Sequence, residues 1–259
     1  MKSHTKKCYL YLAILIIGSQ LLHAQSNFKL PAYESFRLDN GLEIFMVVQK
    51  EVPLVHFRAV VPAGTRRDTK DKAGLAGLTA DALSTGTQSF DKTTIESQLD
   101  FLGASYNTSA GSEAAVISSS FVNKDASVVL PILTEMIVKP IFDLQEFEKL
   151  QERAIAGVDQ MRESPRGVIG NYFNQMVYGD HPYANIPSGT KKSLQQIGIQ
   201  DLKNFYAQNY QPQGSVLAIV GDFDPLVMKI QLSDLLSSWK NNTIFIQCRR
   251  RYECLNCII

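Results

Sequence analysis

Strand-like and helix-like segments follow one another in an irregular order along this chain, and that order constrains the fold more than any other feature. Residues 34–50 alternate around Asn40-Gly41, a dipeptide typical of two-residue hairpin turns. Further strands are predicted over 55–61, 104–109, 113–122 and 215–223, and helices over 74–85, 91–103, 125–138, 143–162, 165–178, 198–210 and 224–237. Without regular βαβ alternation, this order predicts one α+β domain with helices on one face of a mainly antiparallel sheet.

The first 24 residues have the layout of a secretory signal peptide. Lys2, Lys6 and Lys7 form a basic start, residues 9–17 are apolar, and the small residue Ala24 precedes a polar stretch. The apolar run is too short to span a bilayer. We therefore predict export, to a bacterial periplasm, with a mature chain that starts near residue 25; a retained membrane anchor is the alternative.

The composition gives no support for nucleic-acid binding or for stabilisation by disulfide bonds. The net charge is +1, so the sequence offers no strongly basic face for nucleic acid. Cys8 lies in the predicted signal peptide, and the other three cysteines lie in the last dozen residues. Residues 25–240 therefore contain no cysteine, and the domain has to be held together by its core.

The last segment, 241–259, is basic, contains Cys248, Cys254 and Cys257, and shows no periodicity. We predict an aberrant tail from a truncated or frame-altered C-terminus. Three cysteines could also contribute to a zinc site, but a fourth ligand is missing and the spacing is not a standard one.

Six stretches, taken in order, resemble the insulinase/pitrilysin family of metallopeptidases, which includes mitochondrial processing peptidase-like chains. They are "LDNGLEIFMVV", "VHFRAVVPAGTRRDTKDKAGLAGLTADALSTGT", "IESQLDFLGASYNTSAGSEAAVISSSF", "LQERAIAGVDQMRESP", "YGDHPYANIPSGT" and "FYAQNYQPQGSVLAIVGDFDP". The resemblance implies that 25–240 is the N-terminal-type domain of such a peptidase, with the mitochondrial-processing-peptidase-like fold. It corresponds to the first of the two homologous halves that usually make up these proteins.

The catalytic positions of the family motif carry other residues in this chain. The resemblance places a helix reading H-x-x-E-H over "GLAGLTADALSTGT", where two histidines hold zinc and the glutamate activates water. The first histidine falls on Gly77, the glutamate on Ala80 and the second histidine on Asp81. Active family members carry zinc, but we expect no catalytic residue and no cofactor at these positions.

The third ligand of the family is the last glutamate of an E-x6-E motif, and it falls on Asp159, with Glu152 at the first position. Asp81 and Asp159 are the residual metal candidates, although two carboxylates suit a weak oxygen-ligand site rather than tetrahedral zinc. His56, in a predicted strand, and His181, in a turn, are interpreted as structural. The pairs Arg66-Arg67 and Lys191-Lys192 are interpreted as solvated faces.

The resemblance implies a noncatalytic, peptide-binding or scaffold subunit that works with an active H-x-x-E-H zinc peptidase on unfolded, exported peptides. Asn107, Thr108 and Ser109 correspond to the sheet edge to which the peptide adds as a strand; they also fit a polar edge strand without a ligand. Two alternatives remain open. One is a metal-dependent endopeptidase that uses Asp81 and Asp159, and the other is a nonfunctional fragment of a two-domain chain.

Overall fold

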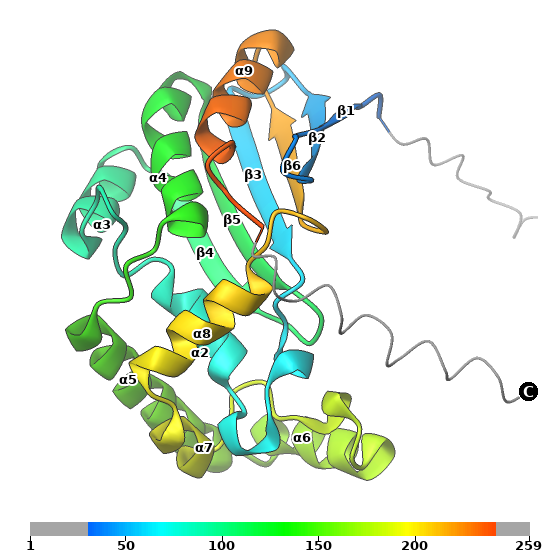
Figure 1. The fold of residues 1–259 in the computed structure, drawn as a ribbon, viewed down its shortest axis with the longest axis vertical. Helices are drawn as coiled ribbons and strands as arrows, with labels where there is room; N and C mark the ends of the chain where they lie inside the picture. Colours follow the sequence, from blue (N-terminus) through cyan, green and yellow to red (C-terminus); the bar gives the residue numbers. More distant parts are fainter. Residues whose placement is uncertain (1–30, 242–259) are drawn as a thin grey trace, which may run out of the picture. The chain divides into compact units, whose positions relative to one another are not determined.

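The computed structural model describes residues 31–241, which form one six-stranded mixed sheet with helices (Figure 1). The strand order across the sheet is β1-β2-β6-β3-β5-β4. All neighbouring pairs are antiparallel except β2 and β6, which are parallel. The strands are β1 (Glu34–Arg37), β2 (Glu43–Val48), β3 (Leu54–Val61), β4 (Ser105–Ala110), β5 (Ala115–Val122) and β6 (Val216–Gly221). The predicted α+β class with a mainly antiparallel sheet is confirmed.

The helices match the predicted segments to within a few residues at each end. They are α2 (Leu75–Ala82), α3 (Lys92–Phe101), α4 (Ala126–Val138), α5 (Leu144–Arg162), α6 (Pro165–Tyr178), α7 (Lys191–Gln196), α8 (Ile199–Asn209) and α9 (Pro225–Leu236). Four 3-10 turns join them: η1 (Thr65–Arg67), η2 (Lys70–Lys72), η3 (Asn123–Asp125) and η4 (Pro182–Ala184). The sequence did not predict α7, because six residues are too few to show helical periodicity.

Local signals in the sequence act as expected at the ends of several elements. Asn40-Gly41 lies in the turn between β1 and β2, where Gly41 has a φ of 93°, but the connection spans residues 38–42 and is longer than the predicted two-residue turn. Asp91 caps α3, since its side chain accepts a hydrogen bond from the N–H of Thr94 at 2.7 Å. Asp143 caps α5 in the same way, through the N–H of Glu146 at 3.0 Å.

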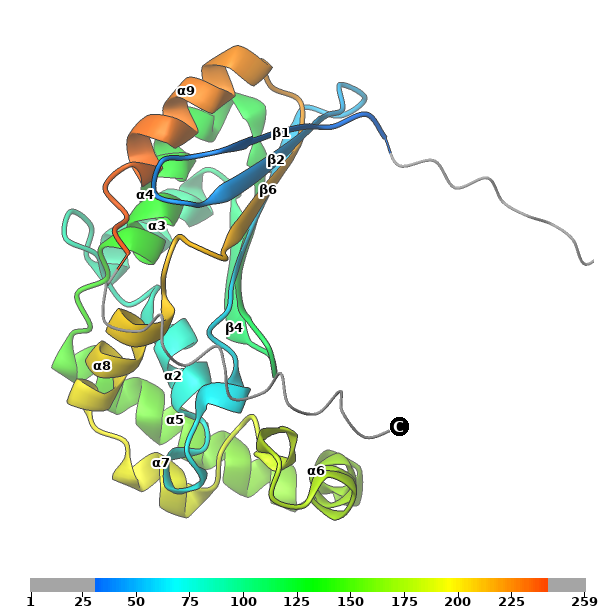
Figure 2. The ribbon, with the colours of Figure 1, turned by 45° about the vertical axis from the view of Figure 1, so that its right-hand side comes forward.

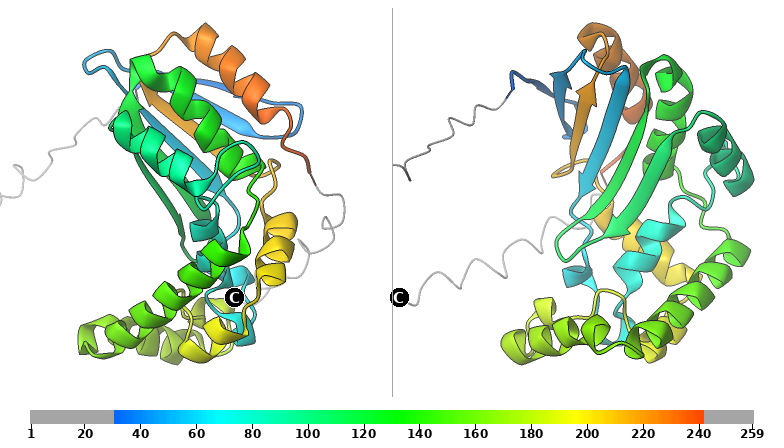
Figure 3. Two further views of the ribbon diagram at one scale, coloured as in Figure 1. Left: turned by 90° about the vertical axis from the view of Figure 1, so that its left-hand side faces the viewer. Right: turned by 180° about the vertical axis from the view of Figure 1, so that it is seen from behind.

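The helices α3, α4 and α9 lie on one face of the sheet, and the opposite face carries no described helix (Figures 2 and 3). The alternation along β3 shows this division, because Val55, Phe57 and Ala59 are buried while His56 and Arg58 are exposed. The core between sheet and helices is built from Ile44, Met46, Val55, Phe57, Ile117, Phe121, Leu130, Leu133, Ile137, Leu217, Ile219, Leu232 and Leu236. Burying each large apolar side chain stabilises the fold by roughly 1.5–3 kcal/mol.

The helices α2, α5, α7 and α8 form a second group at one end of the sheet (Figure 1). The helix α2 packs against α8, α5 and strand β4, and α5 packs against α7. This group holds most of the predicted site residues. Within residues 31–241, no helix combines the length and apolar composition that crossing a membrane requires.

Candidate functional site

The start of α2 is held by a buried carboxyl that the sequence analysis did not single out. Asp68 accepts hydrogen bonds from the backbone N–H of Gly74 at 2.9 Å and of Ala76 at 3.0 Å. Burial raises the pKa of Asp68 to about 7, although the N–H groups of Ala76, Gly74 and Leu75 act in the opposite direction. Asp68 lies six residues before Gly74, a spacing that no common capping pattern uses.

The three motif positions on α2 differ in their surroundings. Gly77 is half-buried, and a Cβ atom there would meet only the carbonyl oxygen of Pro187, at an ordinary 3.7 Å. Ala80 is fully buried, at 0% exposure. Asp81 is exposed one helical turn after Gly77. The first position therefore has room for a side chain. The second position is an apolar contact of the core, and the third carries an exposed carboxylate.

Asp81 is exposed, but the protein around it still removes part of its hydration. This desolvation raises the pKa of the Asp81 carboxyl to about 6, and the positive charge of Arg153 on α5 opposes the shift. Solvent reaches the carboxylate and screens these effects. A guanidinium therefore acts on the residue that is predicted to stand at the position of the second histidine of the motif.

Asp159 on α5 is engaged by a lysine. Its Oδ2 lies 2.9 Å from the Nζ of Lys191, the first residue of α7, and both side chains are about half exposed. The position of α7 is in turn fixed by Gln151 of α5, whose side chain donates to the carbonyl oxygens of Leu194 at 2.6 Å and Ile197 at 2.7 Å. The pair of lysines in the sequence, interpreted as a solvated face, thus supplies one member of an ion pair.

The three predicted peptide-binding residues lie on the edge strand β4, but their side chains do not all face the same side of the sheet. Asn107 and Ser109 are exposed and lie opposite Ser118 and Val116 of β5, on the open face of the sheet. Thr108 is half-buried and lies opposite the buried Ile117, on the face that the helices cover. The strand β4 pairs only with β5, so its other edge is unpaired within the described residues. Main-chain pairing at this edge is possible, but only Asn107 and Ser109 project together.

Neither histidine of the described chain belongs to a cluster of ligands. His56 is exposed on β3, opposite Ser120 and Val220. The Nδ1 of His181 accepts a hydrogen bond from the N–H of Tyr183 at 3.2 Å and so caps η4. Between residues 31 and 241, no group of three His, Cys, Asp or Glu side chains could hold a metal ion. The tail cysteines lie outside the described residues.

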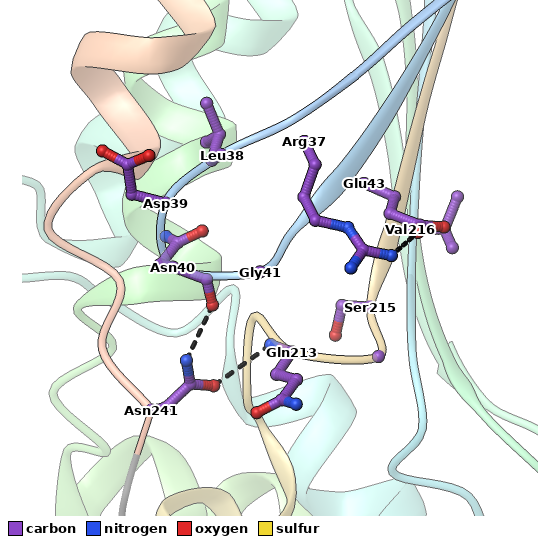
Figure 4. A pocket seen from close by; sticks show the side chains of 11 residues that line it. Arg37, Leu38, Asp39, Asn40, Gly41, Glu43, Gln213, Ser215, Val216 and Asn241 are labelled. Atoms are coloured by element: carbon purple, nitrogen blue, oxygen red, sulfur yellow. Dashed lines mark hydrogen bonds and ion pairs between the residues drawn. The ribbon is translucent and has the colours of Figure 1, made fainter.

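A polar hollow of about 540 Å³ lies elsewhere, between the β1–β2 turn and the loop before β6 (Figure 4). Its polar groups largely bond to one another. Arg37 pairs with Glu43, and Asn241 donates to the carbonyl oxygen of Asn40 at 2.7 Å and accepts from the N–H of Gln213 at 3.1 Å. These bonds tie the turn to the loop, and none of the predicted site residues lines the hollow.

Comparison with protein families identifies the chain. The family model described as "Insulinase (Peptidase family M16)" matches residues 46–191, and the one described as "Peptidase M16 inactive domain" matches residues 196–254. The chain belongs to the peptidase M16 family. The second match enters the 241–259 segment, for which the sequence predicts an aberrant tail; that segment lies outside the described residues.

Relatives within the M16 family include both proteases and a protein named as a non-peptidase. The chain is 27% identical to "Zinc protease PqqE" of Helicobacter pylori, over 81% of this chain and 47% of that protein. It is 23% identical to the mitochondrial-processing peptidase subunit beta of Saccharomyces cerevisiae, over 76% and 42%. It is also 23% identical to "Non-peptidase homolog YmxG" of Helicobacter pylori, over 78% and 45%. The chain thus spans about half the length of these relatives.

Solved structures share the M16 fold. A protease from Helicobacter pylori matches with a TM-score of 0.78 and 21% identity, over 82% of this chain and 52% of that one. The first half of the periplasmic protease PqqL from Escherichia coli matches with a TM-score of 0.74 and 17% identity, over 83% and 48%. These likenesses establish the fold alone.

Proposed function

We propose that this chain is a noncatalytic member of the M16 family that binds unfolded peptide and works with an active zinc peptidase subunit. The observation that carries the proposal is the state of the three ligand positions. Gly77 has no side chain, Asp81 is influenced by Arg153, and Asp159 is bonded to Lys191. Two carboxylates, one of them bonded to a lysine, fall short of the three protein ligands that a catalytic zinc takes, so these residues do not fit a zinc ion.

The position of the general base supports the same proposal. Ala80 can neither accept a proton nor orient water, and its complete burial leaves it as a packing residue of the core. Leu78 and Thr79 do not take this role either, because their side chains are also buried and Thr79 Oγ1 donates to the carbonyl oxygen of Leu75 at 2.8 Å.

Peptide binding is supported by the free edge of β4. An extended peptide that pairs there would gain main-chain hydrogen bonds without strong demands on its sequence. Asn107 and Ser109 would then contact the side chains of the peptide that lie on the open face. Thr108 would act through its packing on the helix-covered face, not through contact with the peptide side chains.

We also propose export and a paired mode of action. The predicted signal peptide, residues 1–24, supports export, and the structural relative PqqL is described as periplasmic. The chain spans about half the length of its relatives, so a peptidase of their length would contain a further domain beside this one. An H-x-x-E-H subunit is the partner that would supply the missing chemistry.

The first test is the zinc content of the purified mature chain, measured by elemental analysis at neutral pH without a histidine tag. We expect less than roughly a tenth of an equivalent, far below the stoichiometry of a structural or catalytic site. An H-x-x-E-H relative purified in the same way is the control and should retain zinc. About one equivalent in this chain would overturn the proposal and favour a metallopeptidase that uses Asp81 and Asp159.

The second test distinguishes a noncatalytic scaffold from a metal-dependent endopeptidase that uses Asp81. With an active partner present, Asp81→Ala should leave peptide cleavage unchanged, because α2 would serve only as support. Asp81→Asn, which keeps the shape of the side chain, is the matched control. A large loss of cleavage with intact folding and assembly would contradict the noncatalytic role. A chain that binds neither peptide nor any partner would instead favour the nonfunctional fragment.

A further inference from the structure

The helix α9 is apolar on both of its sides. Its buried residues, which belong to the core, are Met228, Leu232 and Leu236. The opposite side carries Leu226, Val227 and Ile230, whose exposed fractions are 68%, 52% and 55%. A helix that is apolar all round is normally buried on all sides, so these three exposed side chains mark a surface that a partner covers. They are called the outer face of α9 below.

Two carboxylates flank the outer face of α9. Asp224 precedes the helix and accepts hydrogen bonds from the backbone N–H groups of Leu226 at 2.8 Å and Val227 at 3.0 Å. Asp234 is exposed one turn after Ile230, on the same side of the helix. Among residues 31–241, the carboxylate of Asp234 has no hydrogen bond or ion pair. A partner that fits this surface is therefore apolar, with positive charges beside the apolar residues.

The outer face of α9 is open in the part of the chain that the structure describes. The main helical neighbour of α9 is α4, and it leaves the three apolar side chains exposed. Figures 1 and 2 show α9 at the outside of the helix layer, with no described helix beyond it. The cover has to come from another segment or another molecule.

The chain leaves the described region beside the C-terminal end of α9. The side chain of Asn40 donates to the carbonyl oxygens of Leu236, the last residue of α9, at 2.9 Å and of Trp239 at 3.0 Å. Asn241 in turn donates to the carbonyl oxygen of Asn40 at 2.7 Å. These bonds fix the starting point of the segment 242–259 next to the helix.

The sequence of that segment complements the outer face of α9. Three apolar residues are followed by three basic ones: Ile244, Phe245 and Ile246, then Arg249, Arg250 and Arg251. Residues 242–251 span about 33 Å when extended, whereas the 12 residues of α9 extend for about 18 Å. The model of the M16 inactive domain also matches the chain as far as residue 254. The segment is thus long enough, and of the right chemical character, to run back along α9.

We propose that residues 244–251 fold back over α9, with the apolar residues 244–246 packed on its outer face and the arginines 249–251 beside Asp224. The segment would run antiparallel to the helix, because it starts at the C-terminal end of α9 and Asp224 lies at the N-terminal end. Its apolar residues then come before its arginines, as they do in the sequence. Residues 244–251 would belong to the folded domain and occupy a surface that is otherwise open to another protein. The inference does not depend on whether the chain is catalytic.

The test uses the cysteines of the mature chain, which all lie in this segment as Cys248, Cys254 and Cys257. One chain keeps Cys248 alone, through Cys254→Ser with Cys257→Ser, and a second keeps Cys257 alone, through Cys248→Ser with Cys254→Ser. Labelling by a thiol reagent is followed in buffer and in urea, and the ratio of the two rates gives the protection of each thiol. Cys248 should be protected at least about tenfold, equivalent to 1.4 kcal/mol, whereas Cys257, outside 244–251, should react at nearly its unfolded rate.

A variant of the outer face shows where the protection comes from. Leu226→Gln with Ile230→Gln makes the outer face polar while keeping good helix formers, and it should abolish the protection of Cys248. Phe101→Gln is the control, because Phe101 is 89% exposed on α3, and it should leave the protection unchanged. Circular dichroism establishes that each variant folds.

Several outcomes would overturn the proposal. One is an unprotected Cys248 in the chain with an intact outer face. Another is protection that survives Leu226→Gln with Ile230→Gln, since the segment would then be covered elsewhere. Protection that increases with the concentration of the chain would assign the surface to a second copy, and protection that requires an H-x-x-E-H subunit would assign it to that partner; either result contradicts the proposal.

Discussion

Lys191 Nζ lies 2.9 Å from Asp159 Oδ2, so a lysine neutralises the carboxylate that is predicted to stand at the third ligand position of the family motif. A cation at this point would compete with a metal ion for the same oxygen atoms. The ion pair joins α7 to α5 and has a structural role of its own. Because both side chains are about half exposed, it contributes at most about 1 kcal/mol to stability.

Restored zinc ligands should therefore bind zinc more tightly when Lys191 is removed. We compare the ligand variant Gly77→His, Asp81→His, Asp159→Glu with the same variant carrying Lys191→Ala. The second should bind zinc up to about fivefold more tightly, equivalent to about 1 kcal/mol, since the competing charge is gone. Titration against a chromophoric chelator measures the difference. Lys192→Ala in the same background is the control, and equal affinities with and without Lys191 would contradict the prediction.

Placing the general base of the family in this chain should weaken the fold. Ala80 is fully buried, so Ala80→Glu forces a carboxyl group and added volume into the core. We expect the free energy of unfolding to fall by about 2–4 kcal/mol, as measured by urea denaturation. Ala156→Glu is the matched control, because Ala156 is exposed on α5 and should change little. Similar stabilities for the two variants would mean that α2 still has space for a glutamate.

Asp68 should make stability fall as the pH rises. Its pKa is raised from 3.8 to about 7 in the folded chain, so between these values the folded state holds a proton that the unfolded state has lost. The contribution is complete below pH 3.8 and is lost as the pH rises through about 7. A difference of about three between the two pKa values corresponds to roughly 4 kcal/mol at most.

The measurement for Asp68 is the urea midpoint between pH 4 and pH 8. Asp68→Asn should flatten the fall in stability relative to the wild type, because the titrating group is gone. It should also lower stability at pH 4, since the amide offers one acceptor where Asp68 accepts two backbone N–H groups. Asp91→Asn is the control, because the pKa of that exposed cap is lowered by its hydrogen bonds with Thr94. An unchanged slope for Asp68→Asn would refute the prediction.

The fold could be predicted from the sequence because its signals are local. Asn40-Gly41, the Asp91 cap and the periodicity of residues 143–162 each act within a few residues, and the structure agrees with them. The ion pair between Lys191 and Asp159 could not be predicted, since it joins residues 32 positions apart. The prediction that Asn107, Thr108 and Ser109 act together did not take strand geometry into account. Adjacent positions of a strand face opposite sides of the sheet, so Thr108 does not share a face with the other two.

The loop before α7 depends on a glycine that holds it close to α2. Gly189 has a φ of 71°, and a Cβ atom there would lie 2.4 Å from the carbonyl oxygen of Ala73. Gly189→Ala should therefore lower the free energy of unfolding by more than the cost of a left-handed residue alone, about 1–2 kcal/mol. Gly103→Ala isolates that cost, because Gly103 has a φ of 63° and no neighbour within 4 Å. Equal losses of stability in thermal melts would mean that the loop relaxes away from Ala73. A larger loss for Gly189→Ala would show that the close approach to Ala73 is maintained and helps to position α7, which carries Lys191.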